Sequence, residues 1–322
     1  MNEDTRWMGA AIALAQRGRG RSFPNPNVGC IIMHDGRVVG RGTTAAGGRP
    51  HAEAIALDQA GSLAAGATLF TTLEPCAHIS ARGPTCSDLI IAAGVARVVI
   101  AVGDPDPRTD GKGAGRLRGA GIAVTERVEA DEASRAMAGF LMRQRFGRPH
   151  VTLKLALSLD GCIARADGES QWITGPLARA HGHLERARCD AILVGRATFD
   201  ADKPALDVRL AGLETRSPAR YVLSSGNAPE GWGIIARPQD IAAIAADDIL
   251  IEGGAHTGSS FLAADLVDRL LIYRAPIIIG GGKPALHDIG LAALTDAHGR
   301  WRQIDARSFG ADRLDIYERV RE

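Results

Sequence analysis

The chain has 322 residues, of which 45% are hydrophobic and 23% are charged, and its formal net charge is +1. This length accommodates two domains of ordinary size. The near-neutral charge and the 4% aromatic content argue against nucleic acid as a partner. The apolar runs are too short to span a bilayer, and the first residues lack the basic region of a signal peptide. Five cysteines, an odd number, suit a reducing compartment. We therefore expect a cytoplasmic protein that contacts neither membrane nor nucleic acid.

The first predicted element is an amphipathic helix over 7–16, with Asp4 or Thr5 as its cap. An extended segment follows, because two prolines flank Asn25 and restrict the backbone on both sides of it. Asn25 either presents its amide to a ligand or is an ordinary turn residue. A hairpin is then predicted over 30–40, around an Asp-Gly turn.

The stretch 51–86 carries the clearest chemical signal, because it contains His51, Glu53, Cys76 and Cys86. One imidazole and two thiols can bind zinc and leave a fourth position open, as a catalytic zinc site requires. A carboxylate two residues after the histidine can take a proton from water and return it to a leaving amine. The pattern resembles the signature of zinc-dependent base deaminases, but the cysteines are ten positions apart instead of three. The residues between them must loop out. The alternative is that both thiols are buried and the histidine only starts a helix.

The other elements of the first half alternate between strands and helices. Strands are predicted at 67–73, 95–102 and 122–124, and helices at 52–60, 87–93, 115–120 and 131–146. This order predicts a layered α/β sheet. Gly147-Arg148-Pro149 interrupts the pattern, so we place a domain boundary after residue 147.

The second half is predicted to contain strands at 151–157, 191–194, 221–224, 249–251, 266–273 and 276–279, and a closing hairpin over 304–317. A helix from Pro176 to about Cys189 has proline at its first position. Two strands lead directly into helices, through Gly195–Thr198 and through a Gly-rich turn at 252–260. Both connections can present backbone N–H groups to a phosphate. The Gly-rich turn does not match the dinucleotide fingerprint, so a plain glycine turn remains an alternative.

Five motifs together resemble a known family. In the first half they are Pro24-Asn25-Pro26-x-Val28-Gly29, His51-Ala52-Glu53 and Leu73-Glu74-Pro75-Cys76-x-His78. In the second half they are Lys154-Leu155-x-x-Ser158-Leu159-Asp160-Gly161 and Gly168-Glu169-Ser170-Gln171-Trp172-Ile173-Thr174. The set covers nearly the whole chain and resembles the bifunctional deaminase–reductase of riboflavin biosynthesis.

This resemblance implies an α/β protein with two domains. Residues 1–147 would form a cytidine-deaminase-like α/β/α domain, and residues 148–322 a dihydrofolate-reductase-like α/β domain. The first would use zinc to deaminate 2,5-diamino-6-(5-phosphoribosylamino)pyrimidin-4-one by hydrolysis. The second would use NADPH to reduce the ribosyl side chain to a ribityl chain. The implied cofactors are Zn²⁺ and NADPH, the implied partner is this small phosphorylated pyrimidine, and we expect a homo-oligomer.

The resemblance also implies roles for individual residues. His51, Cys76 and Cys86 would bind zinc, and Glu53 would move the proton. NADPH would contact Ala156, Trp172, Thr198, Asp202, Gly254, Ala255, His256, Thr257, Gly258, Ser259 and Ser260. The substrate would contact Asn25, Ser170, Arg186, Leu206, Arg209 and Glu252, with Arg186 and Arg209 on the phosphate because guanidinium suits bidentate contact.

The chain departs from the family pattern at three places. The spacing between the cysteines is one position longer than usual. Thr44 stands seven positions before the zinc histidine, where the family usually has a histidine, and Lys203 stands where an acidic or amide residue is more common. Two rival interpretations remain. One is a tRNA or nucleoside deaminase with an unrelated second domain, and the other is a structural-zinc binding module with His78 or Cys30 as the fourth ligand.

Overall fold

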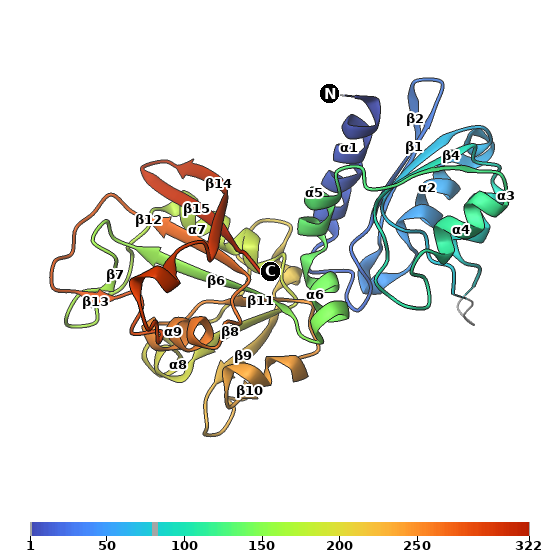
Figure 1. Ribbon diagram of the computed structural model, residues 1–322. Coiled ribbons are helices and arrows are strands. Elements are labelled where there is room, and N and C mark those ends of the chain that lie inside the picture. Colours follow the sequence, from blue (N-terminus) through green and yellow to red (C-terminus); the bar gives the residue numbers. More distant parts are fainter. Residues whose placement is uncertain (1, 79–82, 322) are drawn as a thin grey trace. The chain divides into compact units, whose positions relative to one another are not determined.

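In the computed structural model, residues 2–78 and 83–321 are described, and they form two compact units. The first unit is Met1–Gly147 and the second is Arg148–Glu322. Each has its own sheet and its own hydrophobic core (Figure 1). Within the described residues, no helix is both long enough and apolar enough to cross a membrane.

The first unit is built on a five-stranded sheet with the order β2-β1-β3-β4-β5. The strands are β1 (Gly29–His34), β2 (Arg37–Thr43), β3 (Thr68–Leu73), β4 (Arg97–Val102) and β5 (Ala123–Thr125). β1 pairs antiparallel with β2 and β3, whereas β3, β4 and β5 run parallel. The carboxyl ends of β3 and β4 therefore meet at one edge of the sheet, where ligands often bind in α/β proteins.

Helices cover both faces of this sheet (Figure 1). They are α1 (Glu3–Gly18), α2 (Ala52–Ala60), α3 (Cys86–Ala92), α4 (Lys112–Gly119), α5 (Ala130–Ala136) and α6 (Ala138–Phe146). α1 and α5 lie on one side, and α2, α3 and α4 on the other. Glycines allow the close approach: a Cβ on Gly29 would lie 2.0 Å from the Ala11 carbonyl oxygen of α1, and one on Gly42 would lie 2.1 Å from the Ala52 carbonyl oxygen of α2.

Two details of the first half differ from the sequence prediction. Helix α1 begins at Glu3, because the Asn2 side chain accepts from the backbone N–H of Thr5, so the predicted caps Asp4 and Thr5 are wrong. The single helix predicted over 131–146 is also wrong. It is broken into α5 and α6 at Met137, whose φ of −114° and ψ of 23° are not those of a regular helix.

The second unit contains an eight-stranded sheet with the order β10-β9-β8-β11-β6-β12-β15-β14. The strands are β6 (His150–Leu157), β8 (Ala191–Gly195), β9 (Ala219–Leu223), β10 (Gly233–Ile235), β11 (Asp248–Ile251), β12 (Arg269–Arg274), β14 (Trp301–Phe309) and β15 (Asp312–Arg319). From β10 to β12 all neighbours are parallel, and β15 and β14 add an antiparallel hairpin.

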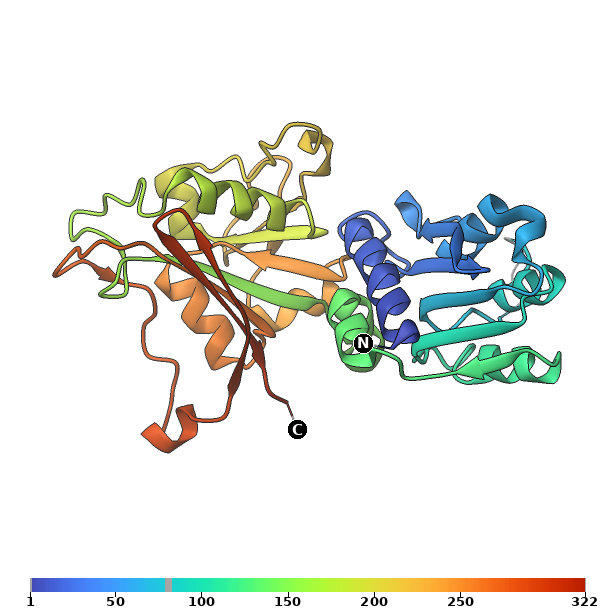
Figure 2. The same ribbon diagram turned by 90° about the horizontal axis from the view of Figure 1, so that it is seen from above.

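Helices also cover both faces of the second sheet (Figure 2). Helix α7 (Pro176–Arg186) packs Ala178 against Leu271 and Tyr273, and α9 (Ala255–Ala263) packs Phe261 among Leu153 and its neighbours on the other face. Helix α8 (Arg196–Asp202) follows β8 directly, and α9 begins four residues after β11 ends.

The predicted strand at 276–279 is wrong, because a two-residue strand forms instead at β13 (Lys283–Pro284). It pairs with β7 (Cys162–Ala164) in a separate two-stranded sheet. Helix α7 also ends at Arg186, before the predicted end near Cys189.

Candidate active sites

The first candidate site lies at the carboxyl end of β3. His51 is the residue just before α2, Cys76 follows β3 after a Glu-Pro pair, and Cys86 is the first residue of α3. The Nδ1 atom of His51 lies 3.3 Å from Sγ of Cys86 and 3.7 Å from Sγ of Cys76. The fold therefore brings the three predicted zinc ligands together, with their ligand atoms within 4.8 Å of one another.

This donor set fits zinc. Thiolate and imidazole are the ligands zinc prefers, and three of them leave the open fourth position of a catalytic site. Hydrogen bonding with Cys86 lowers the pKa of Cys76 to about 4, so this thiol is prepared as a thiolate. Among the described residues, the cluster contains neither Cys30 nor His78. Cys30 lies in the core on β1, and Nδ1 of His78 lies 3.4 Å from the Thr109 hydroxyl.

Glu53 lies in the first turn of α2 and its side chain is buried. Burial raises its pKa to about 7, against the opposing charge of His51. A carboxyl group that titrates near neutral pH can both accept and donate a proton. Because Glu53 lies beside the metal ligands, it can take up and release a proton at that site.

The Asn25 side chain contacts one of the three metal ligands. Its side-chain Nδ2 donates to the Gly48 carbonyl oxygen at 2.7 Å and lies 3.3 Å from Nε2 of His51. Thr44, in contrast, is buried and its hydroxyl accepts from the backbone N–H of Val28 at 3.0 Å. Thr44 is thus engaged in the hairpin. The predicted loop between the cysteines includes residues 79–82, which lie outside the described residues.

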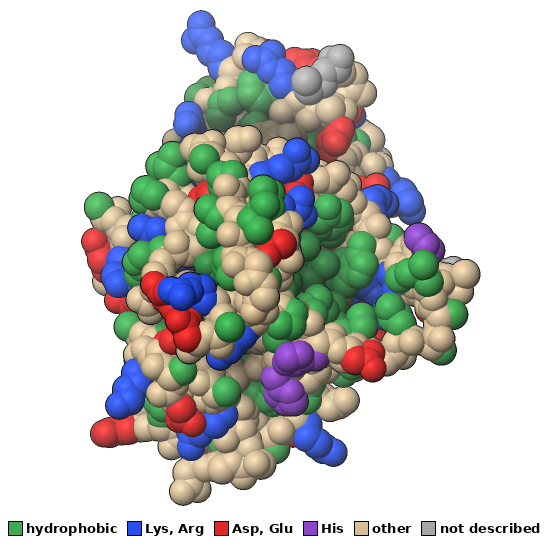
Figure 3. Space-filling view, turned by 90° about the vertical axis from the view of Figure 1, so that its left-hand side faces the viewer, with side chains coloured by type: hydrophobic (Ala, Val, Ile, Leu, Met, Phe, Trp, Pro, Cys, Tyr) green, Lys and Arg blue, Asp and Glu red, His purple; other side chains and the backbone are tan. Residues whose placement is uncertain are grey.

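The second candidate site is a cavity of about 1740 Å³ at the carboxyl ends of the parallel strands of the second unit. Viewed from that side, the surface is hollowed and hydrophobic side chains line part of the hollow (Figure 3). Most of the predicted reductase residues line this cavity: Ala156, Ser170, Trp172, Arg186, Thr198, Asp202, Leu206, Arg209, Glu252, Gly254, Ala255, His256, Thr257 and Ser260. Lys203 also lines it.

Two predicted cofactor residues, Gly258 and Ser259, are not among the cavity-lining residues. The Ser259 hydroxyl accepts from the backbone N–H of His287 at 2.7 Å and lies 3.3 Å from the carbonyl oxygen of the same residue. A Cβ on Gly258 would lie 3.2 Å from Leu286. Both residues therefore serve the packing of α9 in this structure.

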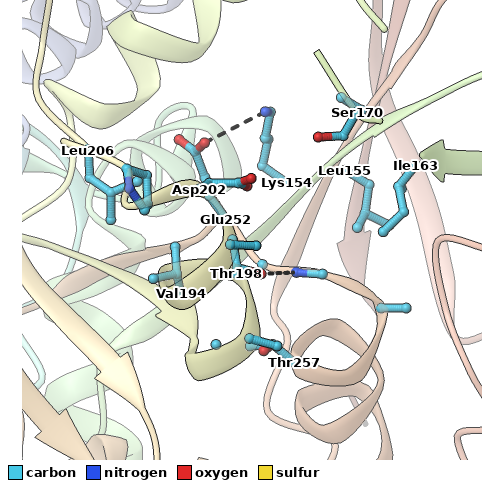
Figure 4. Close-up of a pocket in the computed structure, with 18 of the residues that line it drawn as sticks. Lys154, Leu155, Ile163, Ser170, Val194, Thr198, Asp202, Leu206, Glu252 and Thr257 are labelled. Atoms are coloured by element: carbon cyan, nitrogen blue, oxygen red, sulfur yellow. Dashed lines mark hydrogen bonds and ion pairs between the residues drawn. The ribbon is translucent and has the colours of Figure 1, made fainter. Parts of the chain in front are cut away.

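The Gly-rich turn and α8 are joined at the cavity wall. The Thr198 hydroxyl accepts from the backbone N–H of Gly254 at 3.1 Å, shown as a dashed line in Figure 4. A Cβ on Gly253 would lie 2.8 Å from the Thr257 side chain, and one on Gly195 would lie 2.0 Å from the Thr257 hydroxyl. Only glycine allows this approach of β8 to the start of α9. The N–H groups of the first turn of α9 have no partner within the helix and form its positive end, which lies at the cavity.

Three charged side chains from different elements meet in the wall of the same cavity. The Arg186 guanidinium donates to both Glu252 oxygens, at 2.7 and 2.9 Å, and its third nitrogen donates to the Asp207 carbonyl oxygen at 3.0 Å. Lys154 Nζ lies 3.7 Å from Glu252 (Figure 4). Burial alone would raise the pKa of Glu252, but Lys154 and Arg186 outweigh burial and lower it to about 2.

Sequence reasoning gave no site role to Lys154, although it begins one of the five motifs, or to Tyr273; both also line this cavity. Lys154 is a charged residue in the middle of a mostly aliphatic strand, and that contrast was the available signal. Tyr273 is almost fully buried, and its hydroxyl lies 2.6 Å from Nδ1 of His181. Nothing in its local sequence distinguishes it from an ordinary core tyrosine.

Both halves of the chain match protein-family models. The model of the cytidine and deoxycytidylate deaminase zinc-binding region matches residues 1–102. The model of the RibD C-terminal domain matches residues 149–235 and 239–313.

Full-length relatives are also similar to the chain. The riboflavin biosynthesis protein RibD of Escherichia coli K12 is 40% identical over 92% of this chain and 94% of the relative. RibD of Mycobacterium tuberculosis H37Rv is 41% identical over 95% of each chain.

Two solved structures are similar to the chain over nearly its whole length. Acinetobacter baumannii RibD has a TM-score of 0.88 at 34% identity and covers 99% of both chains. A diaminohydroxyphosphoribosylaminopyrimidine deaminase/5-amino-6-(5-phosphoribosylamino)uracil reductase of Thermotoga maritima has a TM-score of 0.88 at 30% identity, covering 98% of this chain and 99% of that one.

Proposed function

The chain belongs to the RibD family of riboflavin biosynthesis proteins, and from this premise we propose the substrates and residue roles below. Membership confirms the predicted α/β fold class, a cytidine-deaminase-like domain followed by a RibD C-terminal domain. The likeness of the second domain to dihydrofolate reductase stays a prediction. Membership also confirms a bifunctional deaminase and reductase. The predicted zinc fits a matched zinc-binding region whose three ligands converge, and the predicted NADPH fits the reductase half.

We assign the first reaction to residues 1–147. There the enzyme removes the 2-amino group of 2,5-diamino-6-(5-phosphoribosylamino)pyrimidin-4-one by hydrolysis. His51, Cys76 and Cys86 would hold the zinc ion, which would supply the Lewis acidity that makes water nucleophilic at neutral pH. Glu53 takes the proton from the attacking water and delivers it to the departing amine, which leaves as ammonia. Its pKa of about 7 suits both transfers.

We assign the second reaction, reduction of the ribosyl to the ribityl chain, to residues 148–322, where bound NADPH would supply the hydride for C1 of the sugar. Thr198 and the start of α9 receive the dinucleotide, because they present a hydroxyl and free backbone N–H groups to the cavity. Arg186 was expected on the substrate phosphate. Its three donor nitrogens already contact Glu252 and Asp207. The Arg209 side chain is 63% exposed, and its one ion pair among the described residues, with Asp207 at 3.3 Å, is also exposed. We therefore assign the phosphate to Arg209 and give Arg186 the task of orienting Glu252 toward the substrate.

The convergence of His51, Cys76 and Cys86 beside a buried Glu53 carries the deaminase assignment. The test is an assay on the diaminopyrimidinone ribosylamino phosphate that records ammonia release and NADPH consumption separately. We expect both signals, with ammonia release lost on zinc chelation. Ammonia without NADPH consumption would contradict the reductase assignment. Absence of both would return the question to other deaminase substrates.

We further propose that the enzyme works in the cytoplasm as a homo-oligomer. A reducing compartment keeps Cys76 and Cys86 available as thiolate ligands, because oxidation to a disulfide would destroy the site. Light scattering coupled to size-exclusion chromatography tests the assembly. A mass equal to a single 33.8 kDa chain across the concentration range would contradict the oligomer.

A further inference from the structure

The reductase cavity holds most of the chain's lysines. The chain has 38 lysines and arginines together, of which only four are lysines. Three of the four, Lys154, Lys203 and Lys283, line this cavity. Lys154 is paired with Glu252, and Lys203 follows the C-terminal end of α8. Lys283 has no hydrogen-bond or ion-pair partner within the part of the chain that the structure describes, and the assignment above gives it no role.

Lys283 lies on a two-stranded ribbon outside the main sheet of the second unit. It belongs to β13, which pairs antiparallel with β7. Close packing fixes this pairing, because a Cβ on Gly282 would lie 2.4 Å from the Ala164 carbonyl oxygen. The Asp160 carboxylate holds the loop before β13, since it accepts from the backbone N–H of Gly280 at 2.8 Å. The backbone that carries Lys283 is therefore held on both the strand and the loop side.

The acidic groups next to the Lys283 ammonium already bind another cation. Its Nζ atom lies 3.2 Å from the position that a Cβ on Gly168 would take. Asp167 and Glu169 flank this glycine, and both bind Arg165, at 3.4 and 2.6 Å. Lys283 is exposed and lines the cavity, so its ammonium is accessible to a ligand there. The charge is therefore open to an anion from outside the chain.

The segment that follows Lys283 packs along α9. The backbone N–H of His287 donates to the Ser259 hydroxyl at 2.7 Å, and this hydroxyl donates to the His287 carbonyl oxygen at 3.3 Å. Lys283 and His287 line the same cavity as Ala255 and His256, the first two residues of α9. The free ammonium and the free N–H groups at the start of the helix thus border one part of the cavity.

We propose that Lys283 binds the diphosphate of the dinucleotide cofactor, together with the N–H groups at the start of α9. The inference rests on the proposed reductase function. The start of a helix supplies only about half a positive charge, whereas each phosphate of a diphosphate carries a full negative charge, so a cation is needed beside the helix to balance it. Lysine suits this position, because its flexible stem lets the ammonium follow the phosphate oxygens.

The test measures binding of the cofactor without turnover. Calorimetry gives the Kd of NADP⁺ for the wild type, for Lys283→Gln and Lys283→Arg, and for the control Lys112→Gln. Lys112 is an exposed lysine of the first unit and is not among the cavity-lining residues. We expect Lys283→Gln to weaken NADP⁺ binding about 5- to 20-fold at low salt, through loss of a charge-assisted contact. The difference should shrink at high salt, because exposed charges are screened.

The other variants separate the local charge from a general effect. Lys283→Arg keeps the charge and should lose less affinity than Lys283→Gln, while Lys112→Gln should bind NADP⁺ as the wild type does. Adenosine 2′-monophosphate keeps the adenosine and the 2′-phosphate of the cofactor but lacks the diphosphate. Its inhibition constant against NADPH should therefore stay the same in Lys283→Gln, and so should KM for the deaminated substrate.

Three results would overturn the inference and leave the proposed function intact. They are an unchanged Kd of NADP⁺ in Lys283→Gln, an equal loss of affinity for NADP⁺ and adenosine 2′-monophosphate, and a rise confined to KM for the deaminated substrate. Wild-type protein that binds no NADP⁺ would overturn both.

Discussion

The contact between Arg186 and Glu252 gives a prediction whose size follows from the structure. The Glu252 side chain is 12% exposed, and its pKa falls from an ordinary 4.5 to about 2 because Lys154 and Arg186 outweigh burial. One pKa unit corresponds to about 1.4 kcal/mol, so the two partners offset the cost of burial and leave the ionised carboxylate favoured by a net of about 3 kcal/mol. Arg186 supplies both of the short hydrogen bonds. Arg186→Leu should therefore destabilise the second unit by about 3 kcal/mol, in line with other buried pairs that lose one partner.

The assay is urea denaturation of the full chain, followed by tryptophan fluorescence. Three of the four tryptophans lie in the second unit, so this probe reports mainly on that unit. Arg186→Leu should lower the denaturation midpoint strongly, while the double variant Arg186→Leu with Glu252→Leu should recover much of the loss, because replacing a buried ion pair by apolar residues is often neutral. Additive effects of the two substitutions would refute the reasoning.

The same pair predicts a dependence on pH. A carboxyl group with a lowered pKa in the folded state contributes stability above its unfolded pKa and loses that stability as the pH falls through the folded value. For Glu252 this window runs from about 4.5 down to about 2. The difference in stability between wild type and Glu252→Gln should thus be constant above pH 5 and shrink below it. A difference that grows on acidification would contradict the assigned charge state.

Three further results are expected. Glu53→Gln should lower ammonia release by about 10²- to 10⁴-fold, as for loss of a general acid–base group. NADPH consumption on the deaminated substrate should stay normal. Full deaminase activity would contradict the mechanism and favour a structural zinc site instead. Thr198→Val should raise KM for NADPH about fivefold, because the N–H of Gly254 loses its acceptor, whereas Thr198→Ser should not. Gly29→Ala should cost about 3 kcal/mol in thermal unfolding, since its Cβ would meet α1 at 2.0 Å; Gly9→Ala, with open space around it, is the control, and equal effects would refute the packing argument.

The sequence predicted best those features that depend on local spacing and on the ends of strands. His51 and Cys86 each lie at the start of a helix, and Cys76 follows a buried strand, so the topology of an α/β sheet brings them to one edge. The same reasoning places Thr198 and Gly254 at the carboxyl ends of neighbouring strands, β8 and β11. In both units the chemistry of the residue type and the direction of the strand were sufficient.

The sequence predicted poorly those features that tertiary packing decides. The break at Met137 separates two segments with continuous helical composition. Gly258 and Ser259 belong to the expected cofactor segment, but α9 presents only part of its circumference to the cavity. A helix that packs on a sheet turns some of its residues toward the sheet. A short glycine-rich motif does not show which residues of the helix these are.

Two arginines show this limit most clearly, because their local sequences gave no reason to separate them. Arg186 was expected to be available for a phosphate, yet a glutamate 66 positions away in the chain occupies it. No role was predicted for Arg49, yet its Nε is buried without a hydrogen-bond partner among the described residues. A guanidinium carries five N–H donors, so an acidic partner does not exclude a substrate anion, but a bidentate carboxylate occupies one edge of the fork that could otherwise face a phosphate. How much of each guanidinium is available to a substrate therefore depends on acidic residues from distant parts of the chain, and their positions are fixed only when the sheets have assembled.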